Sequence, residues 1–431
     1  MCGAYAEILE NRLMKEVYRL FLDAVKASLE NKSVNWQDDI SPEEWTQLFS
    51  LFDLHGILPM GYNAVYGCSV AKTAETVLLP YKRRAMQSVM IQTVKTDEFL
   101  KLISFLKGEG LTPCVLKGIV CRSLYPLPDL RRSGDEDILV SSDGFFRLHD
   151  AMVRYGMYTE DDVNSGDFEI TYIKKGSPLK IEVHTSLFSP DSQAYGHFNG
   201  LFDGICGRLI TADVNGTHIC TLGHTDHLLY LICHAFKHFI HSGVGIRQVC
   251  DVVLYANRFG EFIDWDRVWE KCRQIRADVF AEAVFCIGRQ FLTFDPEKSG
   301  YIEHRKNRDV NYEGLLEDIL CAGIYGGSEL SRKHSSNMTL NAFSAANKGE
   351  KAGNGVYSSI FLPLSEMRSR YKCTYLEKFP FLLPVAWAGR ICKYGQEVIV
   401  SRCGGKHNGT SEAVRIGRKR IALMRKYDII K

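Results

Sequence analysis

The stretch that decides how the middle of the chain folds is Gly134-Asp135-Glu136-Asp137-Ile138-Leu139-Val140. Its apolar end has the composition of a short, buried β-strand. Asp135 and Asp137 stand two positions apart just before that end, and residues i and i+2 of an extended strand project to the same face. Two carboxylates on one face repel each other unless a cation bridges them. The stretch therefore predicts a strand that begins with a metal-binding carboxylate pair.

A third carboxylate lies on a later strand. The segment from Leu179 to Thr185 alternates between apolar and polar residues, which predicts a strand with Glu182 in its middle. We expect this strand to bring Glu182 to the aspartate pair. Three carboxylates on adjacent strands can hold two Mg²⁺ ions, an arrangement that serves in-line phosphoryl or nucleotidyl transfer. His184 shares the face of Glu182, and two interpretations stay open for it: a contact to the metal site or a satisfied core histidine.

A candidate phosphate site precedes the acidic pair. Val115-Leu116-Lys117-Gly118-Ile119 has the pattern of a strand that ends in Lys-Gly and opens a helix. The first amide N–H groups of a helix have no partner within the helix and can bind phosphate. Lys117 adds a positive charge, and Arg131 and Arg132 lie just before the aspartates. We therefore expect Lys117, Gly118 and Arg131 to contact the nucleotide.

The patterns around these motifs divide the chain into five parts. A small mixed β-sheet with helical regions on both sides gives α+β as the fold class. Asn-Gly at 215–216, between two short apolar runs, predicts a β-hairpin at the end of the sheet. The parts are an N-terminal helical region at 1–108, a sheet-containing core at 109–223, a helical region that covers the substrate at 224–299, a loop or linker rich in Gly, Ser, Asn and Lys at 300–356, and a basic helical region at 357–431.

The composition excludes several classes of protein. Of the 431 residues, 45% are hydrophobic, which is enough for a large core and excludes a wholly disordered chain. With 53 Lys and Arg against 51 Asp and Glu, the net charge of +2 gives no global reason to bind nucleic acid or membranes. The 14 cysteines form no CxxC pair, and many stand in apolar runs, which indicates a reducing compartment. With neither a signal peptide nor an apolar span of about 20 residues, we expect a cytoplasmic protein.

The order of these motifs resembles the nucleotidyltransferase superfamily that includes DNA polymerase beta. Within it, the sequence is most similar to the bacterial group called nucleotidyltransferase family proteins. In that group a Leu-Lys-Gly turn precedes Tyr-Pro, an Arg, an Asp-x-Asp before an apolar strand, and a later Glu-apolar-His. The matching residues are Leu116-Lys117-Gly118, Tyr125-Pro126, Arg131, Asp135-Glu136-Asp137, Ile138-Leu139-Val140 and Glu182-Val183-His184.

The resemblance implies a Mg²⁺-dependent nucleotidyltransferase that binds a nucleoside triphosphate such as ATP and moves its nucleoside monophosphate to a hydroxyl-type acceptor. Asp135, Asp137 and Glu182 are then the catalytic metal ligands. The sequence departs from the superfamily in its Lys-Gly turn, where Gly-Ser is usual, so a serine contact to phosphate is missing. Glu136 stands where many members have an apolar residue, and strand alternation predicts that it points to the face opposite the metal.

Two other functions fit the same residues. A non-catalytic nucleotide-binding or regulatory module would use the same fold, although the loss of a carboxylate would favour it and all three carboxylates are present. A phosphotransferase, which moves the γ-phosphoryl group, uses the same metal arrangement. The sequence does not identify the acceptor, for which a small molecule, an RNA and a protein side chain all stay open.

A cluster of histidines occupies the predicted helix that follows residue 224. His234 and His238 are one helical turn apart, a spacing that can bind zinc, but no third ligand stands nearby. Packing or surface placement is a second interpretation. A third is a role in the cleft, with Lys237 and His238 facing the nucleotide or the acceptor. On that interpretation we expect Lys237 to face the same cavity as Asp135 and Lys117.

Three further expectations concern charged residues. Arg247 and Asp251 are one helical turn apart, which favours an ion pair within a helix. The basic segment at 402–431 fits RNA or acidic lipid as a partner, or a solvated helix face without one. Replacing Asp137 by Asn removes one of several like charges, so the melting temperature is expected to hold or rise.

Overall fold

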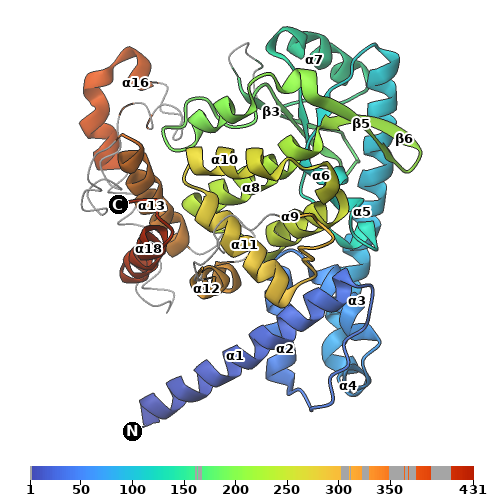
Figure 1. Cartoon of the computed structure of the whole chain (residues 1–431), viewed down its shortest axis with the longest axis vertical. Coiled ribbons are helices and arrows are strands. Elements are labelled where there is room, and N and C mark those ends of the chain that lie inside the picture. The colour runs from blue at the N-terminus through green and yellow to red at the C-terminus, as the bar shows by residue number, and fades with distance from the viewer. Residues whose placement is uncertain are drawn as a thin grey trace.

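The computed structural model describes residues 2–160, 163, 167–301, 310, 312–322, 330–348, 364, 367, 375–389 and 409–431 (Figure 1). Within these ranges, helices surround one mixed β-sheet, which confirms the predicted α+β class. In the view of Figure 1, the sheet lies at the upper right, and the last helices of the chain gather on the left.

The N-terminal region is helical, as predicted for residues 1–108. Helix α2 (Pro42–Leu54) begins at a capping box, in which Ser41 and Glu44 each accept a hydrogen bond from the other's amide N–H. The long helix α5 (Glu75–Gly108) runs beside the sheet (Figure 1). The other helices of this region are α1 (Cys2–Leu29), α3 (Leu58–Tyr66) and α4 (Ser69–Thr73).

Six strands of the described chain form the sheet, in the order β3-β4-β2-β1-β6-β5. The pairs β2–β4 and β1–β6 are parallel, whereas β1–β2, β3–β4 and β5–β6 are antiparallel. The strands are β1 (Cys114–Val115), β2 (Glu136–Leu139), β3 (Glu169–Ile173), β4 (Lys180–His184), β5 (Leu209–Val214) and β6 (Thr217–Leu222). The sheet predicted for the middle of the chain is therefore confirmed.

The turn between β5 and β6 is the predicted Asn-Gly hairpin. Asn215 and Gly216 have φ angles of 52° and 79°. Two successive residues with positive φ match the right-handed twist of the flanking strands, and Asn and Gly adopt this conformation at the least cost. The short helices of this part of the chain are α6 (Lys117–Arg122) and α7 (Phe145–Arg154), with 3₁₀ segments at Pro128–Leu130, Ser142–Gly144, Gly196–Phe202 and Ile205–Arg208.

Four helices follow the sheet, as predicted for residues 224–299. They are α8 (His224–His241), α9 (Ile246–Phe259), α10 (Trp265–Gln274) and α11 (Asp278–Phe291), with a 3₁₀ turn at Gly260–Phe262. Helix α8 is apolar on most of its circumference and buried along most of its length, which is typical of a helix at the centre of a domain. Of its polar residues, Asp226 and His227 are buried, and the others are partly exposed.

The prediction of a loop or linker at 300–356 is wrong for the part of that segment that the structure describes. Helices α12 (Glu313–Ala322) and α13 (Leu330–Asn347) lie within it. Helix α13 is rich in Ser and Asn, which predicts a loop by composition, but its small side chains allow close packing on α18 (Gly409–Lys426). A Cβ atom at Gly417 of α18 would lie 2.7 Å from Met338 Sδ. Tertiary packing has overridden weak local preferences.

The basic C-terminal segment is only partly a solvated helix face. Arg420 of α18 is buried, and its guanidinium donates hydrogen bonds to the carbonyl oxygens of Phe239 and His241 at the end of α8, the latter at 3.1 Å. Lys419, in contrast, forms an exposed ion pair with Glu317 at 2.5 Å. Arg420 thus fastens α18 to α8, a packing role that the sequence did not suggest. The remaining short elements are α16 (Tyr375–Lys378) and a 3₁₀ turn at Pro380–Leu382.

No helix of the described chain has both the length and the apolar character needed to cross a membrane. The ten cysteines whose state the structure describes are free thiols, and six of them are fully buried.

Candidate active site

Asp137 and Glu182 face each other across two neighbouring strands. They are register partners on the parallel pair β2 and β4, so their side chains project to the same face of the sheet. His184 follows Glu182 by two positions and shares that face. One ligand atom from each of Asp137, Glu182 and His184 lies within 4.8 Å of the others. In the described ranges, no other group of His, Cys, Asp and Glu side chains meets this condition.

The two oxygens of the buried Asp137 carboxylate have different surroundings. Oδ1 accepts a hydrogen bond from Lys117 Nζ at 3.0 Å and lies 3.1 Å from His184 Nε2. Oδ2 is buried and has no hydrogen-bond partner in the described chain. Burial alone would raise the pKa of Asp137, but the charge of Lys117 and the hydrogen bond from His184 outweigh it and hold this pKa well below its usual value. Asp137 is therefore ionised, with one oxygen left for a ligand.

A second lysine lies between the other two carboxylates. Lys180 Nζ donates to Glu182 Oε1 at 2.7 Å and lies 4.0 Å from Asp135 Oδ2. Burial and the negative charge of Asp135 raise the pKa of Glu182, and Lys180 only partly offsets them. Two lysines, one for Asp137 and one for Glu182 and Asp135, thus reduce the repulsion among the three carboxylates.

His184 is held from two sides. Besides its contact with Asp137, its Nδ1 lies 3.6 Å from Glu169 Oε2, and Glu169 is its register partner on the antiparallel strand β3. The imidazole therefore stands between two carboxylates of neighbouring strands, with a hydrogen bond to Asp137 only. Of the two interpretations open for His184, the geometry supports a place beside the candidate metal ligands.

Helix α8 supplies the polar residues opposite the sheet. Lys117 Nζ lies 3.1 Å from His234 Nε2, which in turn lies 3.3 Å from His238 Nε2. Burial and the nearby charge of Lys117 hold the pKa of His234 well below its usual value, so its imidazole is neutral and accepts a hydrogen bond from the ammonium. Burial and repulsion by Lys117 also lower the pKa of Lys237, to about 8. Lys237 Nζ stands 5.5 Å from the centre of the Tyr195 ring.

These side chains line one pocket of about 260 Å³. Its apolar wall is formed by Phe168, Leu187, Phe188, Tyr230 and Leu231. Seven of the eight residues predicted from the sequence to form the site lie in its lining, although they come from separate parts of the chain. They are Lys117, Arg131, Asp135, Asp137, Glu182, Lys237 and His238. The convergence of the three carboxylates and the placement of Lys237 are thus as expected, whereas the chemical roles of these residues stay predictions.

Arg131 lines the pocket, but its guanidinium is committed to a carboxylate. Nε and Nη2 donate to Asp251 Oδ1 and Oδ2 at 2.8 and 2.6 Å, and the hydroxyl of Tyr125 donates to the same carboxylate at 2.8 Å. Asp251 therefore pairs with a residue 120 positions away in the chain. The side chain of Arg247, which lies one helical turn from Asp251, donates a hydrogen bond to the carbonyl oxygen of Arg132 at 2.6 Å. The contact of Arg131 with a triphosphate stays a prediction, and the geometry supports a positioning role for it.

Gly118 does not belong to the pocket lining; it faces the other side of the sheet. The Oε2 atom of Glu136 accepts a hydrogen bond from the amide of Ile119 at 2.8 Å, so a carboxylate of the chain itself occupies the start of helix α6. A Cβ atom at position 118 would lie 2.1 Å from that oxygen, which explains why the position requires glycine. Glu136 points away from Asp137, as strand alternation predicted. The contact of Gly118 with phosphate is not supported by this arrangement and stays a prediction.

Two charged residues of the site were not predicted from the sequence. Lys180 and Glu169 have side chains that contact the predicted ligands, but neither stands in a recognisable motif. A signal for Lys180 was available, because it precedes Glu182 by two positions on the same strand and so shares its face. Glu169 could be placed only with the register of β3 against β4.

The donor set fits a divalent cation. Carboxylate oxygens are the ligands that Mg²⁺ and Mn²⁺ prefer, and a histidine nitrogen also accepts softer divalent metals. The unpartnered Oδ2 of Asp137 supports this fit, because a buried carboxylate oxygen without a partner costs free energy unless a cation or donor binds it. Asp137, Glu182 and His184 are the residues that would hold the ion, with Asp135 beside them.

Comparisons with known proteins agree with the geometry. The model of a protein family described as uncharacterised nucleotidyltransferase matches residues 41–293, more than half of the chain. The chain belongs to this family. The match begins at the N-cap of α2 and ends just after α11, so it contains the whole sheet and the pocket described above. No curated protein and no solved structure matches the chain.

Proposed function

We propose that this protein is a divalent-metal-dependent nucleotidyltransferase that moves a nucleoside monophosphate from a nucleoside triphosphate to a hydroxyl-type acceptor. Asp135, Asp137 and Glu182 hold two Mg²⁺ ions in this proposal, with His184 at the edge of the set. Bound there, the ions would stabilise the charge that develops on the attacking oxygen and on the leaving pyrophosphate. The protein would act in the cytoplasm, where nucleoside triphosphates are abundant.

The observation that carries the proposal is the pair formed by Asp137 and Glu182. They face each other in register on parallel strands, and Asp137 Oδ2 is buried without a partner. A structural carboxylate would be expected to have both oxygens satisfied. The family to which the chain belongs supports the kind of reaction, and the pocket supports the place.

Positive charge for the phosphates comes from Lys117 and Lys237. Lys117 stays protonated because the charge of Asp137 raises its pKa against the effect of burial. His234 orients the Lys117 ammonium, and His238 in turn contacts His234. A triphosphate would therefore meet an ammonium that is fixed before it binds, which lowers the entropy cost of binding.

Glu182 is the candidate base for the acceptor. It lies on the pocket wall beside Asp137, where an acceptor hydroxyl could reach it. Phe168 and Phe188 offer aromatic surface for the nucleobase. The volume of about 260 Å³ suits the phosphate end of a nucleotide better than a nucleotide and its acceptor together. The acceptor would then approach from the open side of the pocket.

A labelling experiment tests the reaction. The protein is incubated in cell extract with Mg²⁺ or Mn²⁺ and with each nucleoside triphosphate, labelled at the α-phosphate in one series and at the γ-phosphate in another. The proposal predicts that only the α-label is transferred and that pyrophosphate is released, and that EDTA stops both. Digestion of the product with ribonuclease or protease then shows whether the acceptor is RNA, protein or a small molecule.

Two outcomes would overturn the proposal. Transfer of the γ-label with release of a nucleoside diphosphate would identify a phosphotransferase that uses the same carboxylates. Metal-dependent binding of nucleotide without transfer of either label to any acceptor in the extract would favour a regulatory module.

A further inference from the structure

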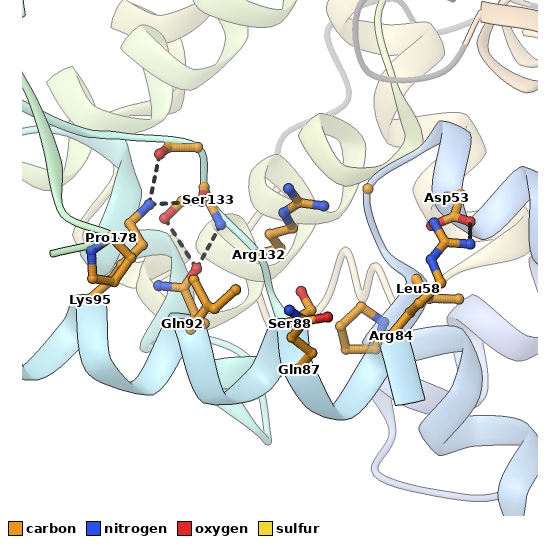
Figure 2. A pocket seen from close by; sticks show the side chains of 14 residues that line it. Asp53, Leu58, Arg84, Gln87, Ser88, Gln92, Lys95, Arg132, Ser133 and Pro178 are labelled. Carbon is orange, nitrogen blue, oxygen red and sulfur yellow. Dashed lines mark hydrogen bonds and ion pairs between the residues drawn. The ribbon is translucent and has the colours of Figure 1, made fainter. Parts of the chain in front are cut away.

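A second pocket lies on the other side of the loop that carries the aspartates. It has a volume of about 410 Å³ and lies between helix α5, the start of helix α3 and residues 132–134 of that loop (Figure 2). It shares no lining residue with the carboxylate pocket. The loop thus faces one pocket with Arg131 and Asp135 and the other with Arg132, Ser133 and Gly134.

The charged groups of this second pocket are mostly positive. Arg84, Lys95 and Arg132 line it, and Asp53, paired with Arg84 at 2.7 Å, is its one acidic lining residue. In the view of Figure 2, the side chain of Arg132 stands between Gln92 and Leu58. Arg132 forms no ion pair with any described residue. An excess of positive charge around a concave site attracts anions.

Two buried polar groups on α5 point to the same kind of ligand. Gln92 Oε1 accepts a hydrogen bond from the amide of Ser133 at 2.8 Å, but Gln92 Nε2 is buried without an acceptor in the described chain. The buried Lys95 donates to the carbonyl oxygens of Ser133 and Gly134 at 2.9 and 2.7 Å. Within the described ranges, no carboxylate lies at ion-pair distance from its ammonium. Buried donors and charges usually have partners, so both groups suggest that an acceptor with negative charge belongs nearby.

The remaining lining sets the size and character of the ligand. Gln87 and Ser88 add neutral polar side chains, and Leu58 and Ile91 add apolar surface. A volume of about 410 Å³ lies within the usual range for small-molecule sites. Guanidinium groups bind carboxylate and phosphate groups in a bidentate fashion, and the excess of positive charge suits the double negative charge of a phosphate monoester better than a single carboxylate.

We propose that this pocket binds a phosphorylated small molecule of about the size of a mononucleotide, with Arg84 and Arg132 on the phosphate. The site lies beside the start of both strands that carry the candidate metal ligands, because Gly134 precedes β2 and Pro178 precedes β4. This pocket would bind its ligand without the metal and without nucleotidyl transfer. The proposal for this pocket therefore does not rest on the function proposed above.

Binding is tested on the full chain in EDTA, which keeps the carboxylate pocket from taking metal-bound nucleotide. AMP, ribose 5-phosphate and inorganic phosphate are titrated separately by calorimetry. We expect saturable binding of one AMP per chain, weaker binding of ribose 5-phosphate and the weakest binding of inorganic phosphate. Absence of binding by all three probes would overturn the proposal, and equal affinity for AMP and inorganic phosphate would overturn the size assigned to the ligand.

Charge variants locate the site. Arg84→Gln and Arg132→Gln should each weaken AMP binding at least tenfold, whereas Asp53→Asn, which removes the acid, should strengthen it. Arg83→Gln is the matched control, because Arg83 is exposed, adjacent to Arg84 and outside the lining, and it should leave the affinity unchanged. All of these side chains are on or near the surface, so the variants should fold.

A further variant separates the two pockets. Lys237→Met removes a positive charge from the carboxylate pocket only, so it should not change AMP binding in EDTA. Loss of AMP binding in Lys237→Met, or an equal loss in Arg83→Gln and Arg84→Gln, would show that AMP binds elsewhere and would overturn the proposal. Failure of nucleotidyl transfer in the labelling experiment would leave these results unaffected.

Discussion

The two faces of strand β2 place neighbouring carboxylates in opposite situations. Glu136 is fully satisfied: Oε1 accepts from Arg122 Nη1 at 2.5 Å and from Ser133 Oγ at 2.9 Å, and Oε2 accepts from the amide of Ile119. Asp137, the next residue, has one oxygen paired and the other buried without a partner. Both side chains are almost completely buried. Burial therefore does not distinguish them, whereas the completeness of their hydrogen bonding does.

This difference separates a structural carboxylate from a candidate ligand-binding one. The ion pair between Glu136 and Arg122 ties α6 to β2, and together with the other two hydrogen bonds it leaves neither oxygen of Glu136 open for a ligand. The group around Asp137 keeps an open oxygen, and the other oxygen contacts Lys117 and His184 at the wall of a pocket. Substitutions on the Asp137 face should therefore affect function first, and those on the Glu136 face should affect stability first.

The largest effect is expected for Asp137→Asn. Because a metal ligand is lost, nucleotidyl transfer should fall at least about 100-fold, the upper range seen when residues that only support a ligand are changed. The structure also alters the expectation for stability. The negative charge of Asp137 is balanced by Lys117, so its removal leaves a largely buried ammonium without its acid, and the melting temperature should fall rather than hold or rise.

Two measurements check this prediction. Transfer of the α-label is compared between wild type and variant at saturating metal, and thermal unfolding is followed in EDTA. Asp143→Asn, an exposed acid in the 3₁₀ turn that follows β2, is the matched control and should change neither. Full activity in Asp137→Asn would remove this residue from the site.

Glu136→Gln should show the reverse pattern. The variant keeps the shape of the side chain but removes the charge that faces Arg122, whose side chain is 1% exposed. Breaking a fully buried ion pair in this way costs about 3 kcal/mol. Chemical denaturation should therefore show a large loss in the free energy of unfolding. The fraction of Glu136→Gln that is folded should keep most of its transfer activity. A loss of activity as severe as that of Asp137→Asn, with unchanged stability, would contradict the assignment of the two faces.

Gly118→Ala tests the same structural face from its other side. The added methyl group would meet Glu136 Oε2 at 2.1 Å, so the carboxylate must move away from the amide of Ile119. Overpacking of this kind costs about 1–3 kcal/mol. Denaturation should show this loss, and metal-dependent binding of ATP to the folded variant should be nearly unchanged. If ATP affinity fell strongly while stability held, the sequence-based assignment of Gly118 to phosphate binding would be correct after all.

How far the sequence could predict this site depends on the range of the interactions. The placement of Asp137 and Glu182 follows from strand alternation, which is local, and from the expectation that their strands are neighbours. The hairpin at Asn215 is likewise a local preference of two residues. The pair of Arg131 with Asp251 spans 120 positions and depends on how α9 packs against the loop, so no spacing rule could reveal it. The helix spacing of Arg247 and Asp251 suggested a local pair instead.

The failure at residues 330–347 has a different cause. A composition rich in Ser and Asn is typical of loops, because these side chains form hydrogen bonds with their own backbone and favour turns. Here Ser335, Ser336 and Thr339 are buried, and the hydroxyl of Thr339 lies within hydrogen-bond distance of the carbonyl oxygens of both serines. Small residues of this kind form a helix when a partner helix can approach closely, and the sequence alone did not show that α18 is that partner.

The smallest expected effect concerns the positive charge of one lysine on the Asp137 face of the sheet. Lys237 lies on the Asp137 side of the sheet, and burial together with repulsion by Lys117 lowers its pKa to about 8. Its positive charge is therefore present below pH 8 and is lost as the pH rises through that value. If this charge contacts the nucleotide, the affinity for ATP with Mg²⁺ should fall about tenfold between pH 7 and pH 9.5, which is the magnitude of one charge-assisted hydrogen bond.

Lys237→Met should bind about tenfold more weakly at pH 7 and show no such fall, whereas Lys237→Arg should keep its affinity at pH 9.5, because a guanidinium stays protonated. Titration of ATP binding at the two pH values decides the matter: identical pH profiles for wild type and Lys237→Met would mean that this lysine serves packing against Tyr195 rather than the ligand.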